Sequence, residues 1–85
     1  MDWNAYSFVI RSSYRRAVLK ALETERTPSQ VAKQAKIANS HASRALSELE
    51  AKKLVRCLTP KAVTGRIYAL TLLGKEVLGQ LQKSQ

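Results

Sequence analysis

The 85-residue sequence is poor in the residues that build disulfides, metal centres and most active sites. Cys57 is the single cysteine, so no internal disulfide can form, and there is one histidine, which leaves no Cys/His cluster for zinc. Because Cys57 lies in an apolar run, we interpret it as a buried strand residue rather than a reactive thiol. These absences predict a protein of a reducing compartment that uses no metal ion and no cofactor.

Acidic residues and long apolar runs are scarce as well. The 6 acids and the 1 histidine are scattered, with no nucleophile–base spacing and no phosphate-binding loop, which argues against an enzyme. There is no apolar run long enough to span a membrane, and Arg11 interrupts residues 8–10 before a signal-peptide core develops. We therefore predict a cytoplasmic protein without a membrane segment, and the sequence leaves a small-molecule effector open.

Positive charge is what the sequence has in excess. Its 15 lysines and arginines against 6 acids give a formal net charge of +9 and a pI of about 10.2. Such a balance favours phosphate-rich partners or acidic surfaces, although charge that serves only solubility is the alternative. The length fits a single domain over residues 1–85, which would bury about 60–65% of its unfolded surface.

The first half of the chain predicts a terminal extension and one amphipathic helix. Residues 1–11 form the extension, and its aromatic residues need cover from their own domain or from a second subunit. Ser12 or Ser13 can cap a helix that runs to about Glu23. Its side chains divide into an apolar stripe and a basic face left mainly to solvent: Tyr14, Ala17, Val18, Ala21 and Leu22 in the stripe, and Arg15, Arg16 and Lys20 on the basic face.

Residues 27–55 predict a helix-turn-helix. Thr27 and Gln30 can cap a short helix reciprocally, with Pro28 in its first turn, and this helix runs to about Lys36. After a turn at Ile37, Asn39 or Ser40 can cap the next helix. The inward residues are small or aliphatic in both helices: Val31, Ala32 and Ala35 in the first, and Ala42, Ala45, Leu46 and Leu49 in the second.

A hairpin and a final helix complete the expected fold. Residues 54–59 and 66–70 predict two strands, with a turn between them in which Gly65 can take positive φ. Thr71 can cap a helix over residues 71–82 with an apolar strip along it. The predicted fold class is mainly α with a small β-hairpin: a winged helix-turn-helix with a three-helix core, a two-stranded wing and a C-terminal helix.

The outward face of the second helix of this motif carries the candidate DNA-reading residues. Short polar side chains permit close approach to the major groove, and Arg44 can contact guanine through two donors. A phosphate contact or an ion pair with Glu48 is the alternative for Arg44, although Arg before Glu is the weaker order for a helix pair. His41 could donate to a base edge or a phosphate, or be a solvated surface residue.

Several residues around this helix could hold the phosphate backbone. The wing supplies basic side chains around a flexible tip, and the start of the motif supplies hydroxyls, for which capping is an equally good explanation. Arg15 and Arg16, with Arg11, could add contacts from the flank. The complete candidate DNA-binding set is Thr27, Ser29, Asn39, Ser40, His41, Ser43, Arg44, Ser47, Lys61, Thr64, Arg66, Arg15 and Arg16.

The strings RSSYRRAVLKAL, TPSQVAKQAKI, SHASRALSELEAKKLV and CLTPKAVTGRIYALTLLGKEVL resemble archaeal winged-helix transcriptional regulators of the ArsR/MarR-like kind. The resemblance covers roughly residues 8 to 80 and is most specific in SRALSELE and GRIYALTLLGKEVL. It implies a homodimer that binds double-stranded DNA, with residues 40–47 in the major groove and residues 61–66 on the wing. The dimer interface would draw on the N-terminal aromatics and the final helix: Trp3, Tyr6, Leu73, Val77, Leu78 and Leu81.

The sequence departs from this family at two places. Many relatives carry Gly where Lys53 stands, so either Lys53 takes a left-handed conformation or the helix ends differently. Relatives also often carry a charged residue where Leu72 or Leu73 stands, which suggests a more apolar final helix here. One cysteine argues against metal sensing.

We expect a sequence-specific, homodimeric transcription regulator. An architectural DNA-binding protein of low sequence specificity has the same charge and fold, and a winged helix can also serve only protein–protein interaction.

Overall fold

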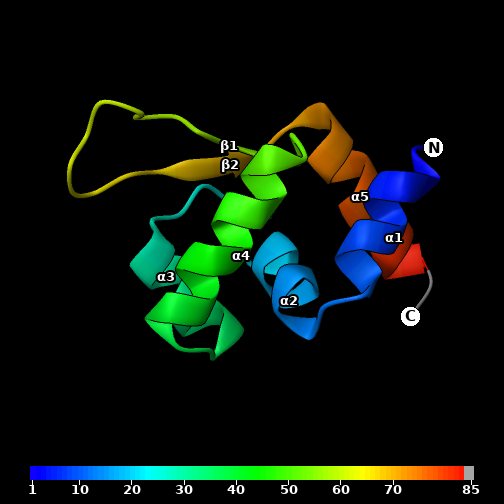
Figure 1. The fold of residues 1–85 in the computed structure, drawn as a ribbon, viewed down its shortest axis with the longest axis horizontal. Helices are drawn as coiled ribbons and strands as arrows, with labels where there is room; N and C mark the ends of the chain where they lie inside the picture. The colour runs from blue at the N-terminus through cyan, green and yellow to red at the C-terminus, as the bar shows by residue number, and fades with distance from the viewer. Residues whose placement is uncertain (84–85) are drawn as a thin grey trace.

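A computed structural model describes residues 1–83 of the chain (Figure 1). The described residues form helices and one two-stranded antiparallel sheet, in the order α1 (Trp3–Ile10), α2 (Ser13–Ala21), α3 (Pro28–Ala35), α4 (Asn39–Ala51), β1 (Val55–Cys57), β2 (Tyr68–Leu70) and α5 (Leu72–Lys83). The predicted class, mainly α with a small hairpin and a C-terminal helix, is confirmed. None of the described helices is long and apolar enough to cross a lipid bilayer.

The core lies where α2, α3 and α4 contact one another. Leu19, Leu46 and Leu49 are fully buried there, and Val31 joins them from α3. Burying one such side chain stabilises the fold by about 1.5–3 kcal/mol, so this cluster fixes the relative positions of the three helices. The small buried residues predicted between α3 and α4, Ala32, Ala42 and Ala45, are confirmed as buried.

The helix starts follow the predicted caps with one exception. The Ser12 hydroxyl accepts from the amide of Arg15 at 3.3 Å and begins α2, which ends at Ala21, two residues before the predicted end. Thr27 and Gln30 form the predicted reciprocal capping box, at 3.2 and 2.9 Å. The prediction that Asn39 or Ser40 caps α4 is wrong, because Ala38 takes the cap position without a side-chain hydrogen bond.

Two of the helices end on lysines in the left-handed region. Lys36 after α3 and Lys53 after α4 both have φ of 60°. This conformation lets the amide of Leu54 donate to the carbonyl of Leu49 at 2.9 Å, so a terminal carbonyl of α4 is satisfied. Lys53 therefore adopts the left-handed conformation that the missing glycine implies.

The hairpin pairs β1 with β2 in antiparallel register, with Val55 opposite Leu70 and Cys57 opposite Tyr68. Both strands are shorter than predicted. The backbone of Arg26 bonds to Tyr68 from the other side, in both directions, at 3.2 and 2.9 Å. Burial of Tyr68 raises the pKa of its hydroxyl, and the nearby Arg66 charge opposes this in part. The two backbone bonds between Arg26 and Tyr68 attach the hairpin to the connection that leads into α3.

Residues 1–11, predicted as an extension, contain a helix. Asp2 caps α1 by accepting from the amide of Ala5 at 3.0 Å, and Val9 is fully buried. The helix contacts α2 and α5, so the domain itself covers part of the N-terminal apolar surface. Trp3 remains 58% exposed and meets the Tyr6 ring edge-on at 5.7 Å.

The apolar strip of α5 belongs largely to the core. Val77, Leu78 and Leu81 are buried within this one chain, and Leu73 is half-buried. Little of their surface is therefore exposed to a second subunit, and their role in a dimer interface stays a prediction. The predicted cap is confirmed, since the amide of Gly74 donates to the Thr71 hydroxyl at 3.1 Å.

Candidate nucleic-acid interface

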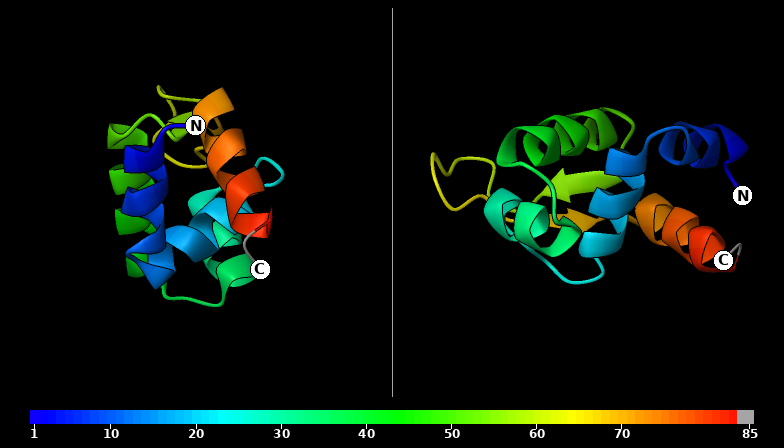
Figure 2. Two further views of the ribbon diagram at one scale, coloured as in Figure 1. Left: turned by 90° about the vertical axis from the view of Figure 1, so that its right-hand side faces the viewer. Right: turned by 90° about the horizontal axis from the view of Figure 1, so that it is seen from below.

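The helix-turn-helix and the hairpin loop lie at one end of the molecule. Figure 1 shows α3, the start of α4 and the hairpin loop extending to the left, whereas α1 and α5 lie at the right. The view from below in Figure 2 gives the same separation. The start of α4 and the tip of the hairpin therefore lie away from α1 and α5.

The face of α4 divides as its sequence predicts. Ala42, Ala45, Leu46 and Leu49 are buried, and every predicted outward residue is exposed, namely Ser40, His41, Ser43, Arg44 and Ser47. Most of the outward residues are short, so an approaching surface could come close to the helix, with Arg44 reaching beyond the rest.

Positive charge predominates at this end of the molecule, where Glu48 beside Arg44 is the nearby acid. The six acids of the sequence are Asp2, Glu23, Glu25, Glu48, Glu50 and Glu76, so none falls in residues 26–47 or 51–75. The exposed basic residues in those two stretches include Lys33, Lys36, Arg44, Lys61 and Arg66. An anionic partner would therefore meet attraction along α3, the first half of α4 and the hairpin loop.

The hairpin loop is held by bonds across its base. The amide of Leu58 donates to the carbonyl of Ile67 at 2.7 Å, and the amide of Ile67 donates to the Thr59 hydroxyl at 3.0 Å. Gly65 has φ of +68°, as predicted. Arg66 donates through Nη2 to the carbonyl of Pro60 at 3.1 Å, so part of its guanidinium is used within the loop.

Lys61 and Thr64 are exposed in the same loop, together with Val63. These two of the three predicted wing contacts are therefore accessible, with no side-chain hydrogen bond recorded for either within residues 1–83. Of the predicted hydroxyls at the start of α3, Thr27 is engaged in the capping box and Ser29 is exposed.

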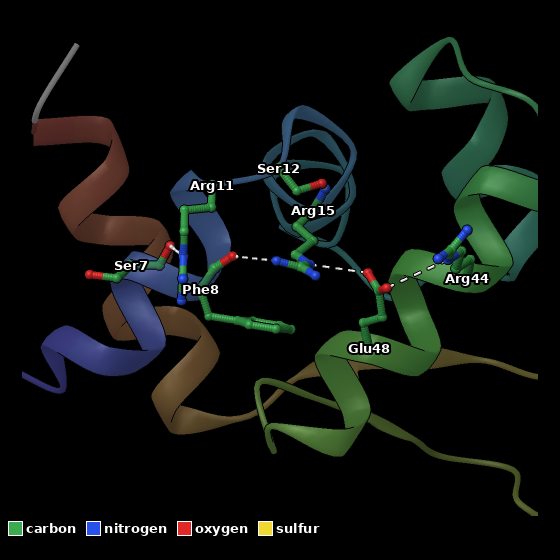
Figure 3. Close-up of polar contacts among 7 residues, drawn as sticks. All are labelled: Ser7, Phe8, Arg11, Ser12, Arg15, Arg44 and Glu48. Atoms are coloured by element: carbon green, nitrogen blue, oxygen red, sulfur yellow. Dashed lines mark hydrogen bonds and ion pairs between the residues drawn. The ribbon is translucent and has the colours of Figure 1, made fainter.

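Figure 3 shows a chain of polar contacts that leads from α1 to α4. Glu48 Oε1 accepts from Arg15 Nε at 3.0 Å, and Glu48 Oε2 lies 3.6 Å from Arg44 Nε. Arg15 also donates through Nη1 to the carbonyl of Phe8 at 2.9 Å. The ion pair between Arg44 and Glu48, disfavoured by residue order, is thus present.

The basic face of α2 differs from the prediction. Arg15 is not left mainly to solvent, because Glu48 and the Phe8 ring hold its guanidinium, the latter at 3.8 Å from the ring centroid. Arg16 donates to the carbonyl of Ile10. Arg11 donates to the carbonyl of Ser7 at 3.2 Å. Arg15 and Arg16 therefore connect α2 to α1, whereas the Arg11 bond lies within the end of α1.

His41 stacks on Tyr14, with 4.3 Å between the ring centroids and 10° between the planes. Tyr14 is 41% exposed, so its predicted place in the apolar stripe of α2 is wrong. Its partner, His41, lies on α4, and the periodicity of apolar residues along α2 does not reveal a contact with another helix. The stack covers one face of the His41 ring, so His41 is more than a free surface residue.

Within residues 1–83 no group of three or more His, Cys, Asp or Glu side chains gathers at metal-binding distance. Cys57 lies in β1 as predicted, and it is half-buried rather than buried.

No protein-family model matches the chain, and no curated protein matches it. Solved structures do resemble it. A MarR-family transcription regulator superposes with a TM-score of 0.79 at 21% identity, over 95% of this chain and 58% of that chain. TubR of Bacillus thuringiensis, bound to 24 bp of tubC, superposes with a TM-score of 0.80 at 13% identity, over 94% of this chain and 90% of that chain. ZitR of Lactococcus lactis, in complex with DNA, superposes with a TM-score of 0.72 at 18% identity, over 85% of this chain and 51% of that chain.

At these identities the likeness shows the fold, which is a winged helix like that of the MarR-family and TubR structures. The predicted fold class is confirmed in this respect. The chain spans 58% of the length of the MarR-family regulator. TubR comes from Bacillus thuringiensis and ZitR from Lactococcus lactis, and these structures give no support to the archaeal part of the resemblance.

Proposed function

We propose that this protein is a transcription regulator that binds double-stranded DNA sequence-specifically as a homodimer. The observation that carries the proposal is the exposed polar row of α4, beside a hairpin loop on an end of the molecule that has no acidic residue in residues 26–47 or 51–75. An α-helix fits the major groove, where base edges present donors, acceptors and thymine methyls.

The reading residues in this proposal are Ser40, His41, Ser43, Arg44 and Ser47. Arg44 is 82% exposed, which leaves it free to reach a guanine edge. The stack on Tyr14 limits the orientations of His41, so its ring would approach DNA from a restricted set of positions.

Phosphate contacts would set the register of the complex and supply much of its affinity. We assign them to Lys61, Thr64 and Arg66 on the hairpin and to Ser29 and Asn39 at the helix starts. No side chain caps α4, so its first backbone amides are available to a phosphate as well. Thr27 and the flanking arginines would contribute less, because their polar groups are already bonded within the domain.

A homodimer would place two α4 helices about 34–36 Å apart, one turn of DNA. Trp3 is the exposed aromatic best suited to an interface among the predicted residues, and Tyr6 packs beside it. Leu72 at the start of α5 is 79% exposed and adds apolar surface. The buried residues of α5, Val77, Leu78 and Leu81, would hold the exposed residues of this interface in place by packing in the core.

Selection of bound duplexes from a random pool, at two salt concentrations, tests the proposal. A palindromic consensus enriched at both salts is the expected result, because a twofold dimer reads a twofold site. Binding to all duplexes alike would instead favour an architectural DNA-binding protein. The absence of DNA binding at low salt would refute the proposal and leave protein–protein interaction as the role of the fold.

A further inference from the structure

Glu48 contacts two arginines that differ sharply in exposure. Arg15 Nε donates to Oε1 at 3.0 Å, and the Arg15 side chain is 20% exposed. Arg44 Nε lies 3.6 Å from Oε2, and the Arg44 side chain is 82% exposed. Figure 3 shows the carboxylate between the two guanidinium groups. One arginine is thus held inside the domain while the other reaches into solvent.

The Arg15 side of this arrangement is anchored at further points. Arg15 Nη1 donates to the carbonyl of Phe8 at 2.9 Å, and its guanidinium carbon lies 3.8 Å from the centroid of the Phe8 ring. Arg15 cannot turn away without losing these contacts with α1. Because the bond from Arg15 to Glu48 joins two charged groups, it is strong enough to fix the carboxylate in turn.

The contact with Arg44 leaves the far end of its guanidinium unused. Of the five N–H donors of an arginine, one is on Nε and four are on the two Nη atoms. Glu48 lies on the Nε side in an ion pair at 3.6 Å, and no hydrogen bond of the Arg44 side chain is recorded within residues 1–83. A bidentate contact with guanine O6 and N7 needs a pair of donors, which the two Nη groups can supply.

We propose that Glu48 is a positioning residue for base recognition, holding Arg44 in one orientation with its Nη groups directed outward, and that Arg15 fixes Glu48. This inference rests on the proposed function, because it needs Arg44 to read a base. Ordering Arg44 before DNA arrives lowers the entropy lost on binding. The negative charge of Glu48 also opposes indiscriminate contact with phosphates. Both effects favour the specific site over other DNA.

The test compares affinities for the selected duplex and for a random duplex. In E48Q the ratio of the two affinities should fall by about threefold to tenfold, with no loss of affinity for random DNA. E50Q is the matched control, because Glu50 is exposed on the same helix and has no ion pair within residues 1–83. It removes the same charge and should leave the ratio unchanged.

Two outcomes of this comparison would overturn the inference. Equal changes on both duplexes in E48Q would mean that Glu48 acts through its charge or through folding alone. The same fall in E50Q would mean that any acid on α4 has this effect. In an R44A background, E48Q should not change the ratio further, since the residue that it positions is gone.

A measurement without DNA separates the inference from the proposed function. In the full chain, the NMR signal of the Arg44 Nε–H should exchange slowly with water, and exchange should quicken in E48Q and not in E50Q. If the exchange rate of the Arg44 Nε–H is the same in E48Q as in the wild type, Glu48 does not hold Arg44, whatever the DNA results are. If Glu48 slows this exchange in a wild-type protein that prefers no duplex, the proposed function is refuted, and the positioning role with it.

Discussion

The backbone of Gly74 approaches the carbonyl oxygen of Leu54 so closely that a Cβ atom on Gly74 would lie 2.0 Å from it. The same carbonyl accepts from the amide of Thr71 at 3.1 Å. The first turn of α5 is therefore docked on the backbone that links α4 to β1. Glycine at this position is required by the approach of two backbones, because no side-chain movement can relieve the contact.

G74A should lower the free energy of unfolding by about 2–3 kcal/mol, because the added methyl group forces α5 away from the domain. G79A is the matched control in the same helix, since nothing lies within 4 Å of its added Cβ. It should instead raise the free energy of unfolding by about 0.4–1 kcal/mol. Urea unfolding followed by circular dichroism measures both values, and equal effects at the two glycines would contradict the docking.

Lys53 and its neighbour Lys52 should respond to glycine in opposite directions. Lys53 has φ of 60°, where a side chain is strained, whereas Lys52 has φ of −94°. K53G should therefore raise the free energy of unfolding by about 0.5–1 kcal/mol, the relief of strain exceeding the added entropy of the unfolded chain. K52G should lower it by about 0.5–1 kcal/mol.

The two variants remove the same charge from adjacent positions, so a purely electrostatic effect would move both stabilities the same way. Thermal unfolding at one ionic strength decides the matter. In a domain of this size, 1 kcal/mol corresponds to a change in Tm of about 4–8 °C. A lower Tm for K53G would show that the lysine side chain contributes more than its strain costs.

The parts of the fold that sequence reasoning located depend on local bonds. Ser12, Thr27 and Thr71 each mark a helix start, because a hydroxyl accepts from a backbone amide three residues on. The start of α4 was placed too late because Ala38 supplies no such signal. Asp2 does supply one for α1, so that helix could have been predicted from its cap.

The side chains that sequence reasoning misplaced have partners far away in the chain. The spacing along α2 predicts Tyr14 in the apolar stripe, but Tyr14 stacks on His41 of α4. The same spacing predicts Arg15 on the solvent side, but Arg15 pairs with Glu48, which is 33 residues away. Periodicity reports which face of a helix is apolar, and it carries no information on pairs formed at the edge of that face.

The outward face of α4 was predicted in full because its alternation with buried alanines and leucines is a local pattern. The role of those residues in DNA binding remains a prediction.

R44A should weaken binding to the preferred duplex by about 1–3 kcal/mol and relax specificity at one base pair. K20A removes a positive charge from an exposed site on α2 and serves as the control. Fluorescence anisotropy on specific and random duplexes measures both, and equal losses on the two duplexes in R44A would refute base reading.

The hairpin should behave differently from α4. Lys61 is exposed in a loop whose other basic residue, Arg66, is partly engaged with Pro60. If Lys61 contacts a phosphate, K61A should lower affinity for all sequences alike, and the slope of log affinity against log salt should become shallower by about one. K83A removes the same charge from the last turn of α5, at the opposite end of the molecule (Figure 1), and should leave this slope unchanged. Salt titrations of the three proteins on a random duplex give the slopes.

A K61A slope equal to that of the wild type would remove the hairpin from the proposed interface, whereas a loss confined to the preferred duplex would make Lys61 a reader of sequence or groove shape.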